Sequence, residues 1–147
     1  MKKIAIALLT CFTLLQARAA ELQWLTDLPK AQAQAKAENK MVLLDFTGSD
    51  WCGWCIKFKT EALDPTEFKD YAAKNLVLVE VDFPRKTPQS AALKKANDAL
   101  SKQYKVDGFP TFVVLSKDGV EIGRQDGYAP GKATAFITKL DGFKKKN

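Results

Sequence analysis

The sequence predicts an α/β fold in a single domain, with helices flanking a central mixed β-sheet. Three observations support this prediction. Residues 41–47 and 76–82 are nearly unbroken apolar runs, the pattern of strands that are covered on both faces. Segments with helical periodicity alternate with these runs along the chain. With 147 residues, 46% of them hydrophobic, the chain is long enough to bury one substantial core.

The N-terminus has the pattern of a secretory signal peptide. Lys2 and Lys3 precede an apolar run over residues 4–15, and Ala17-Arg18-Ala19 offers a small residue on each side of Arg18. We therefore expect a signal peptide over 1–19, cleavage after Ala19, and one domain over 20–147 with its core in 22–143.

Two alternatives to cleavage are weaker. A membrane anchor needs about 20 apolar residues, and this run is shorter. Lipidation of Cys11 is disfavoured because Thr10 is large for the residue before a lipidated cysteine.

In the first half of the mature chain, we expect two strands and a helix. Residues 22–25 could form a short edge strand. Asp27 is a plausible N-cap for a helix over 28–38, and Asn39 is a stop signal. The buried-type strand 41–47 follows, interrupted only by Asp45.

A helical region is predicted between the two apolar strands. We expect a helix from Cys52 to about Leu63 and a second segment capped by Asp64, with Pro65 at its first position. The result is one helix kinked at Pro65 or two helices that abut. The strand 76–82 comes next.

The second half of the chain predicts a helix, a hairpin and a closing helix. Thr87 and Pro88 begin a helix whose apolar face packs on the sheet. Strands 111–115 and 120–124 are joined by the turn 117–119. The side chains of the two apolar helical faces are Leu93, Ala96, Leu100 and Tyr104, and Ala133, Phe136, Ile137 and Leu140.

The most informative motif is Trp51-Cys52-Gly53-Trp54-Cys55, which lies between a strand and a helix. Cysteines spaced in this way can place their sulfurs within bonding distance across the first helical turn, where the free backbone N–H groups favour a thiolate. Cys52 is then the attacking thiolate and Cys55 the resolving thiol. After removal of the signal peptide, these are the only two cysteines of the chain.

Composition excludes several other functions. The chain has no histidine, which argues against a metal site and removes Cys-His and Ser-His-Asp catalysis. The mature chain keeps 20 basic and 17 acidic residues, a charge too mild to indicate nucleic-acid binding. No Gly-rich phosphate loop or dinucleotide fingerprint is present, so electrons must come from a protein partner.

Three motifs in the right order resemble the signature of the thioredoxin family. They are Asp45-Phe46, Trp51-Cys52-Gly53-Trp54-Cys55 and Gly108-Phe109-Pro110-Thr111, and the resemblance covers residues 22–143. The stretch from Asp45 to Cys52 resembles exported bacterial members. The resemblance implies a thioredoxin fold and a redox-active Cys52–Cys55 disulfide as the only redox group.

The resemblance also implies roles for individual residues. Pro110 matches the family's cis proline, which lies against the disulfide and docks the substrate peptide, and Phe109 would face the substrate. Asp45 matches the buried aspartate that exchanges a proton with Cys55, and burial in so apolar a strand should raise its pKa. The alternative for Asp45 is a carboxylate satisfied by backbone groups at a sheet edge.

The sequence departs from ordinary thioredoxins near the cysteines. Six residues separate Asp45 from Cys52, one more than usual, and Trp54 replaces the usual proline. The family's inward lysine has no counterpart in 76–80. Trp51 and Trp54, on either side of Cys52 and next to Gly53, could be core aromatics, but we favour an apolar collar for substrate.

Together these features predict an exported, periplasmic or secreted thiol–disulfide oxidoreductase, acting as a reductase on protein substrates. A membrane or periplasmic redox partner would reset the pair, and we expect a monomer. An oxidase or isomerase of the same fold is the first alternative. A peptide-binding module in which Cys52–Cys55 is a static bridge is the second, although so short a loop contributes little stability.

Overall fold

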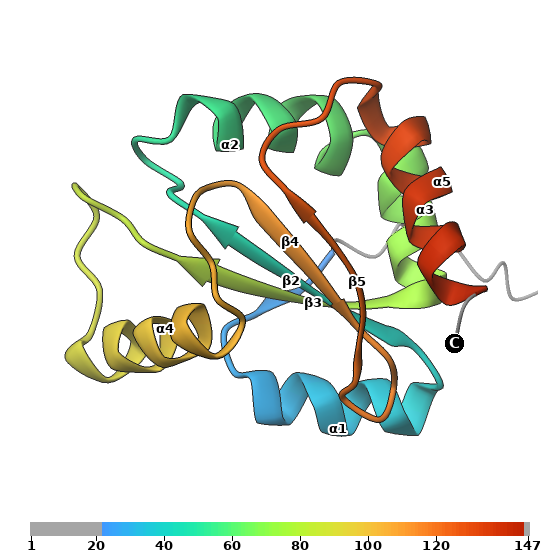
Figure 1. The fold of residues 1–147 in the computed structure, drawn as a ribbon, viewed down its shortest axis with the longest axis horizontal. Coiled ribbons are helices and arrows are strands. Elements are labelled where there is room, and N and C mark those ends of the chain that lie inside the picture. Colours follow the sequence, from blue (N-terminus) through green and yellow to red (C-terminus); the bar gives the residue numbers. More distant parts are fainter. Residues whose placement is uncertain (1–21, 146–147) are drawn as a thin grey trace, which may run out of the picture.

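The computed structural model describes residues 22–145, so the predicted signal peptide and its cleavage site lie outside the described residues. A five-stranded sheet with the order β1-β3-β2-β4-β5 forms the centre of the molecule. Helices α1 (Leu28–Glu38) and α4 (Ala91–Gln103) lie below the strands and α2 (Gly53–Phe58) above them (Figure 1). Within the described part of the chain, no helix is long and apolar enough to cross a membrane.

The sheet is mixed, as predicted. The two-residue edge strand β1 (Trp24–Leu25) pairs in parallel with β3 (Leu76–Asp82), which pairs in parallel with β2 (Met41–Thr47). Strand β4 (Thr111–Leu115) runs antiparallel between β2 and β5 (Glu121–Asp126). All seven residues of β2 are buried, which confirms the interpretation of its apolar run as a strand covered on both faces.

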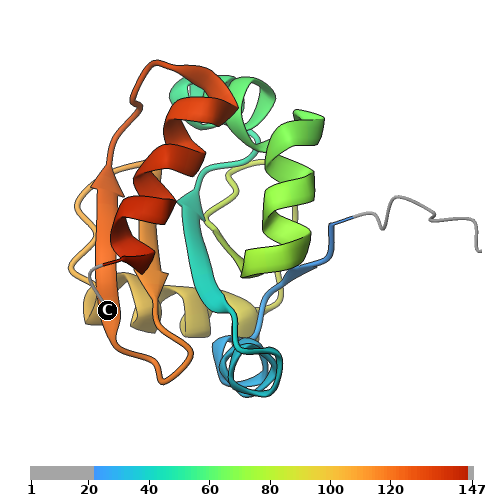
Figure 2. The same cartoon turned by 90° about the vertical axis from the view of Figure 1, so that its right-hand side faces the viewer.

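Each face of the sheet has its own apolar core, because alternate residues of a strand point to opposite sides. Val42, Leu44 and Phe46 pack with α1 and the end of α4. Met41 and Leu43 face the other core, with α2, α3 (Thr66–Asn75) and α5 (Lys132–Lys144). Helices α3 and α5 lie side by side on that face (Figure 2).

The ends of α1 are those predicted from the sequence. The Asp27 carboxylate accepts a hydrogen bond from the Lys30 backbone N–H at 2.9 Å. Asn39 closes the helix in the left-handed conformation with φ 53°, a geometry that asparagine tolerates better than most residues. Both ends of the helix therefore lie where the sequence predicted them.

The predicted continuous helix from Cys52 to Leu63 is only partly correct. The chain is α-helical to Phe58 and then forms a wider π-helical turn over Lys59–Leu63, labelled η1. Asp64 does not cap α3, because its carboxylate pairs with Lys59 instead. Pro65 occupies the N-cap position of α3, so the region is two separate helices rather than one kinked helix.

Helix α4 begins at Ala91, four residues after the predicted start. Thr87 lies outside the helix, with its N–H bound to the Asp50 carboxylate, and the hydroxyl of Ser90 caps the helix by accepting from Leu93 N–H at 3.2 Å. Of the predicted apolar face, Leu100 and Tyr104 reach the core, whereas Ala96 is exposed. Strand β5 also begins and ends later than predicted, at Glu121 and Asp126.

Candidate active site

Cys52 and Cys55 lie at the start of α2 and are joined by a disulfide, with their Cα atoms 5.2 Å apart. Cys52 is the N-cap of α2, and its Sγ accepts the backbone N–H of Cys55 at 3.2 Å. A backbone N–H directed at a sulfur favours its thiolate form after reduction. The two cysteines are 7% and 5% exposed, whereas Gly53 and Trp54 between them are exposed.

A tight turn before the cysteines positions Cys52. The carbonyl of Gly48 accepts from the N–H groups of Trp51 at 3.2 Å and Cys52 at 2.8 Å. A Cβ atom on residue 48 would lie only 2.5 Å from the Trp51 ring, so glycine is required for this close approach.

Trp51 connects the disulfide to the loop that carries Pro110. Its indole Nε1–H donates to the carbonyl of Phe83 at 2.7 Å, and its ring centroid lies 6.1 Å from that of Phe109. Because Trp51 precedes Cys52 and Phe109 precedes Pro110, this contact brings the two predicted motifs together. The Phe109–Pro110 peptide bond is cis.

Trp54 has a different environment from Trp51. Its side chain is 58% exposed, and its ring centroid lies 5.0 Å from that of Tyr128, whose hydroxyl donates to the Glu61 carboxylate. The Lys57 amino group lies 5.4 Å from the Trp54 ring and 5.1 Å from the Tyr128 ring. Trp54 is therefore not a core aromatic, while Trp51 is half-buried and hydrogen-bonded.

Asp45 lies in the middle of the sheet, with β2 between β3 and β4. Its side chain is 8% exposed, and its Oδ1 has no hydrogen-bond partner among residues 22–145, so satisfaction by backbone groups at a sheet edge is wrong. Burial raises the pKa of Asp45 to about 8, with further increases from the Glu80 and Asp82 carboxylates and an opposing effect from Lys59.

Glu80 is the register partner of Asp45 on β3. Residues paired across neighbouring strands project to the same face of the sheet. Burial, followed by the charge of Asp82, raises the pKa of Glu80 as well. Strand β3 therefore places a carboxylate opposite Asp45.

Four residues near the cysteines were not identified from the sequence: Asp50, Phe83, Arg85 and Tyr128. The sequence placed Phe83 and Arg85 in a linker after β3, and no local pattern indicates that this linker returns to Trp51. Tyr128 follows β5, and only the fold brings it to Trp54.

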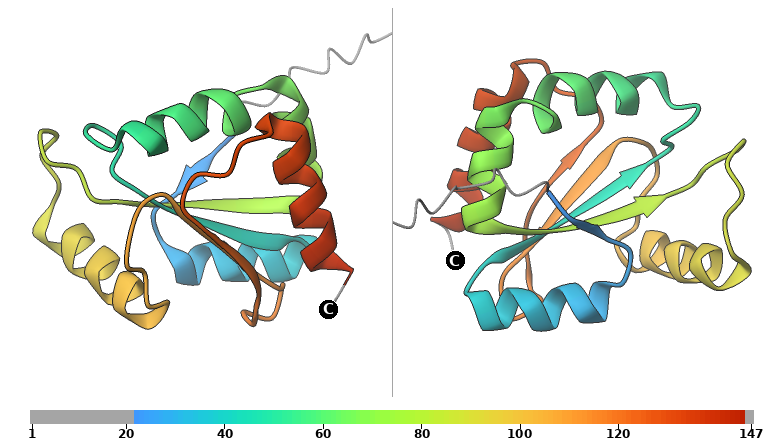
Figure 3. Two further views of the ribbon diagram at one scale, coloured as in Figure 1. Left: turned by 45° about the horizontal axis from the view of Figure 1, so that its top comes forward. Right: turned by 180° about the vertical axis from the view of Figure 1, so that it is seen from behind.

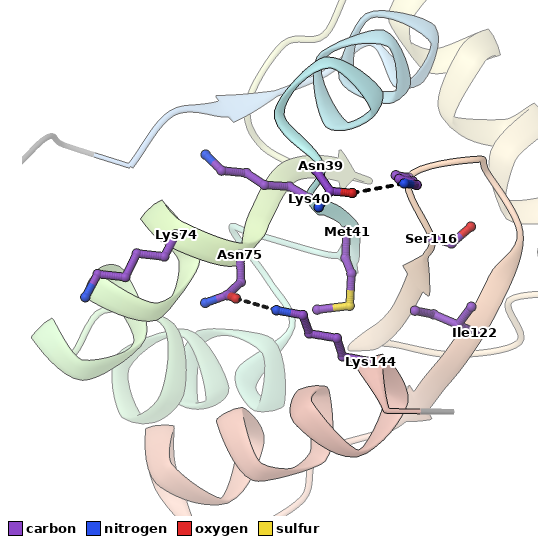
Figure 4. Close-up of a pocket in the computed structure, with 9 residues that line it drawn as sticks. Asn39, Lys40, Met41, Lys74, Asn75, Ser116, Ile122 and Lys144 are labelled. Carbon is purple, nitrogen blue, oxygen red and sulfur yellow. Dashed lines mark hydrogen bonds between the residues drawn. The ribbon is translucent and has the colours of Figure 1, made fainter. Parts of the chain in front are cut away.

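A pocket of about 270 Å³ lies at the end of the sheet away from the cysteines, where β2 begins at Met41 (Figure 4). Four lysines line it, but Lys117 and Lys144 donate to the side-chain oxygens of Asn39 and Asn75. The amino groups of Lys40 and Lys74 point away from the pocket (Figure 4). These amino groups do not converge on a common point, so we assign no anion site there.

A family model described as a thioredoxin-like domain matches residues 28–143. The chain belongs to the thioredoxin-like family. The match covers nearly all of the region in which the sequence resembles that family.

Individual thioredoxin-like relatives agree with this assignment. The chain is 42% identical over 122 residues to "Disulfide bond reductase DsbH" of Chlamydia pneumoniae, covering 83% of this chain and 72% of the relative. A solved structure titled "DsbH Oxidoreductase" superposes with a TM-score of 0.80 at 39% identity, covering 91% of this chain and 94% of that one.

A more distant relative is "Thioredoxin-related protein DsbJ" of the same organism, which is 29% identical over 151 residues. That match covers 95% of this chain and 43% of the relative.

These matches and the geometry agree on the chemistry. The protein is a thioredoxin-like thiol–disulfide oxidoreductase, and its redox group is the Cys52–Cys55 disulfide. Within residues 22–145, no group of three or more histidine, cysteine, aspartate or glutamate side chains could hold a metal ion.

Proposed function

We propose that this protein is an exported disulfide reductase, in which the reduced Cys52–Cys55 pair reduces disulfide bonds of client proteins. The observation that carries the proposal is the position of Cys52 at the N-cap of α2, with a backbone N–H on its sulfur and the Phe109–Pro110 loop beside it. A sulfur in this position is favoured as a thiolate and lies where a client strand can dock.

The reaction proceeds in two exchanges. The Cys52 thiolate attacks one sulfur of the client disulfide, forms a mixed disulfide and displaces the other client sulfur as a thiolate. The Cys55 thiolate then attacks Cys52, which releases the second client thiolate and forms the Cys52–Cys55 disulfide. Two electrons pass to the client, and the leaving thiolates take up protons.

Asp45 is proposed to accept the proton that Cys55 must lose before the second exchange. A pKa of about 8 is suitable for this step, because the group can both bind and release a proton near neutral pH. Burial in the centre of β2 provides that pKa.

The residues around Cys52 are proposed to bind the client. Trp54 offers an exposed aromatic surface, Gly53 is exposed with open space around its Cα, and Trp51 and Phe109 form an aromatic wall beside Pro110. These five residues would hold an extended client segment next to the attacking sulfur.

Sequence features support export and a protein electron donor. The signal-peptide pattern over 1–19 and the absence of cysteines other than Cys52 and Cys55 after cleavage suit a mature domain of residues 20–147 in the periplasm or outside the cell. We propose that a membrane or periplasmic redox protein reduces the disulfide again and that the protein acts as a monomer.

The equilibrium of the disulfide against a glutathione buffer tests the direction. We expect a potential near the thioredoxin value of about −270 mV. A value near the strongly oxidising end, about −120 mV, would instead identify an oxidase, and an intermediate value near −180 mV an isomerase.

Thiol reactivity tests whether the pair is catalytic at all. Alkylation of the reduced protein as a function of pH should titrate a thiolate well below the free-cysteine pKa of about 8.5. Cys55→Ser should accumulate a mixed disulfide with a client, and Cys52→Ser should not. Titration at or above the free-cysteine value, with no trapped client, would indicate a static bridge in a peptide-binding module.

A further inference from the structure

The loop that follows β3 is tied to the segment that precedes Cys52. The Asp50 carboxylate accepts three successive backbone N–H groups, those of Arg85 at 2.9 Å and of Lys86 and Thr87 at 2.8 Å each. Both connections leave the same end of the sheet (Figure 3). These hydrogen bonds therefore hold the loop after β3 against the segment that leads into Cys52.

Further contacts hold the two segments together. The Asp82 carboxylate accepts from the backbone N–H and hydroxyl of Ser49, and Phe83 N–H donates to the Thr47 carbonyl at 2.9 Å. The hydrogen bonds to Asp50 lower its pKa to about 2, so it stays ionised and keeps its acceptors at physiological pH. The position of this loop is therefore fixed by the fold rather than by a client.

The loop places Arg85 over Trp51. The guanidinium carbon lies 3.6 Å from the centroid of the Trp51 ring, and Arg85 is exposed. Stacking on an aromatic face leaves the N–H groups at the edge of the guanidinium free to donate to a planar acceptor. Among residues 22–145, the Arg85 side chain has no hydrogen bond or ion pair, although its backbone N–H is bound by Asp50.

The neighbouring carboxylates do not compete for the Arg85 guanidinium. Asp50 binds backbone N–H groups with both oxygens, and Asp82 binds Ser49 with both of its own. Both carboxylates are therefore bound within the loop, whereas the side chains of Arg85 and Lys86 are exposed at the surface. The cationic side of this loop therefore faces the solvent next to the disulfide.

We propose that Arg85, stacked on Trp51 and held there by Asp50, binds a carboxylate side chain of the client, so that disulfides flanked by Asp or Glu are preferred. The inference rests on the proposed reductase function and specifies its substrate class. A guanidinium and a carboxylate can form two parallel hydrogen bonds, which supplies the geometric selectivity that a mobile lysine lacks.

Matched peptides test the proposal. Each carries one disulfide to a small uncharged thiol, and the residues beside its cysteine are Glu in one peptide, Gln in the second and Lys in the third. Single-turnover reduction by the pre-reduced protein should give kcat/KM about three- to tenfold higher for the Glu peptide than for the Gln peptide, as for a partly exposed charge-assisted pair. This preference should decrease as salt is added.

Three variants locate the effect. Arg85→Gln should reduce the Glu and Gln peptides at equal rates. Lys69→Gln removes another exposed positive charge, on α3, a helix that lies far from this loop (Figure 1), and should keep the full preference. Asp50→Ala leaves Arg85 in the sequence but releases the loop, so a folded Asp50→Ala protein, checked by thermal unfolding, should also lose the preference.

The outcomes separate this inference from the proposed function. Equal rates for Glu and Gln peptides with the wild-type protein, or a preference that survives Arg85→Gln, would overturn the carboxylate site. A preference that persists in folded Asp50→Ala would overturn the role of Asp50. Failure of the wild-type protein to reduce even a small uncharged disulfide would instead overturn the reductase function.

Discussion

The replacement Asp45→Asn tests the electrostatics beneath the disulfide. An asparagine has nearly the same shape as aspartate but does not titrate, so it removes the proton equilibrium while keeping the packing of β2. The pKa of Asp45 rises from 3.8 in its ordinary range to about 8 in the folded protein, chiefly through burial. Between these two values the folded protein binds a proton that the unfolded chain has released.

The sign and size of the effect follow from this difference. Because the folded state binds more protons, raising the pH through this interval lowers the free energy of unfolding of the wild-type protein. The loss is about 1.4 kcal/mol per pH unit, or about 4 kcal/mol between pH 4.5 and pH 7.5. The substitution also buries an amide group, and this changes the free energy of unfolding by an amount that does not depend on pH.

Urea unfolding of the oxidised proteins at pH 4.5, 6 and 7.5 measures the prediction. The free energy of unfolding of Asp45→Asn minus that of the wild type should increase by several kcal/mol across this series. Asp70→Asn, an exposed change on α3, serves as the control and should follow the wild type. A difference between Asp45→Asn and the wild type that stays constant with pH would refute the raised pKa.

Three further predictions concern stability, each measured by urea unfolding. Asp27→Ala removes the N-cap of α1 and should lower the free energy of unfolding by about 1 kcal/mol. Leu140→Ala empties a fully buried position on α5 and should lower it by about 2–5 kcal/mol. Gly123→Ala places a Cβ against the Phe143 ring and should lower it by about 1–3 kcal/mol, whereas Gly142→Ala, whose Cβ meets open space within α5, should raise it by up to about 1 kcal/mol. Unchanged stability in Asp27→Ala or Leu140→Ala, or equal effects at the two glycines, would contradict the corresponding contact.

Local signals in the sequence predicted much of the fold. The apolar runs of β2 and β3 gave strands buried on both faces, and Asp27 and Asn39 gave both ends of α1. These predictions succeeded because strand burial and helix capping depend on residues close together in the chain. The Cys52–Cys55 pair was predicted for the same reason, since its geometry is contained within one helical turn.

The errors lie where more than one local arrangement was compatible with the sequence pattern. Asp64 has the sequence pattern of a cap, but its carboxylate pairs with Lys59 as the helix widens into η1. Thr87 has the pattern of a helix start, but Ser90 is the residue that caps α4, which begins only at Ala91. Asp64 had two possible partners, both Thr87 and Ser90 could have begun α4, and the sequence pattern does not decide between these alternatives.

The sequence by itself determined the family, the redox pair and the alternation of strands and helices, because each depends on residue types at short spacings. Only the tertiary structure decided what surrounds the sulfurs. The apolar run around Asp45 already predicted its raised pKa, but only the pairing of β2 with β3 brings Glu80 opposite it. Arg85 lies over Trp51 because Asp50, 35 positions earlier, binds its backbone. Contacts of this kind depend on which segments the fold brings together, and no local pattern records them.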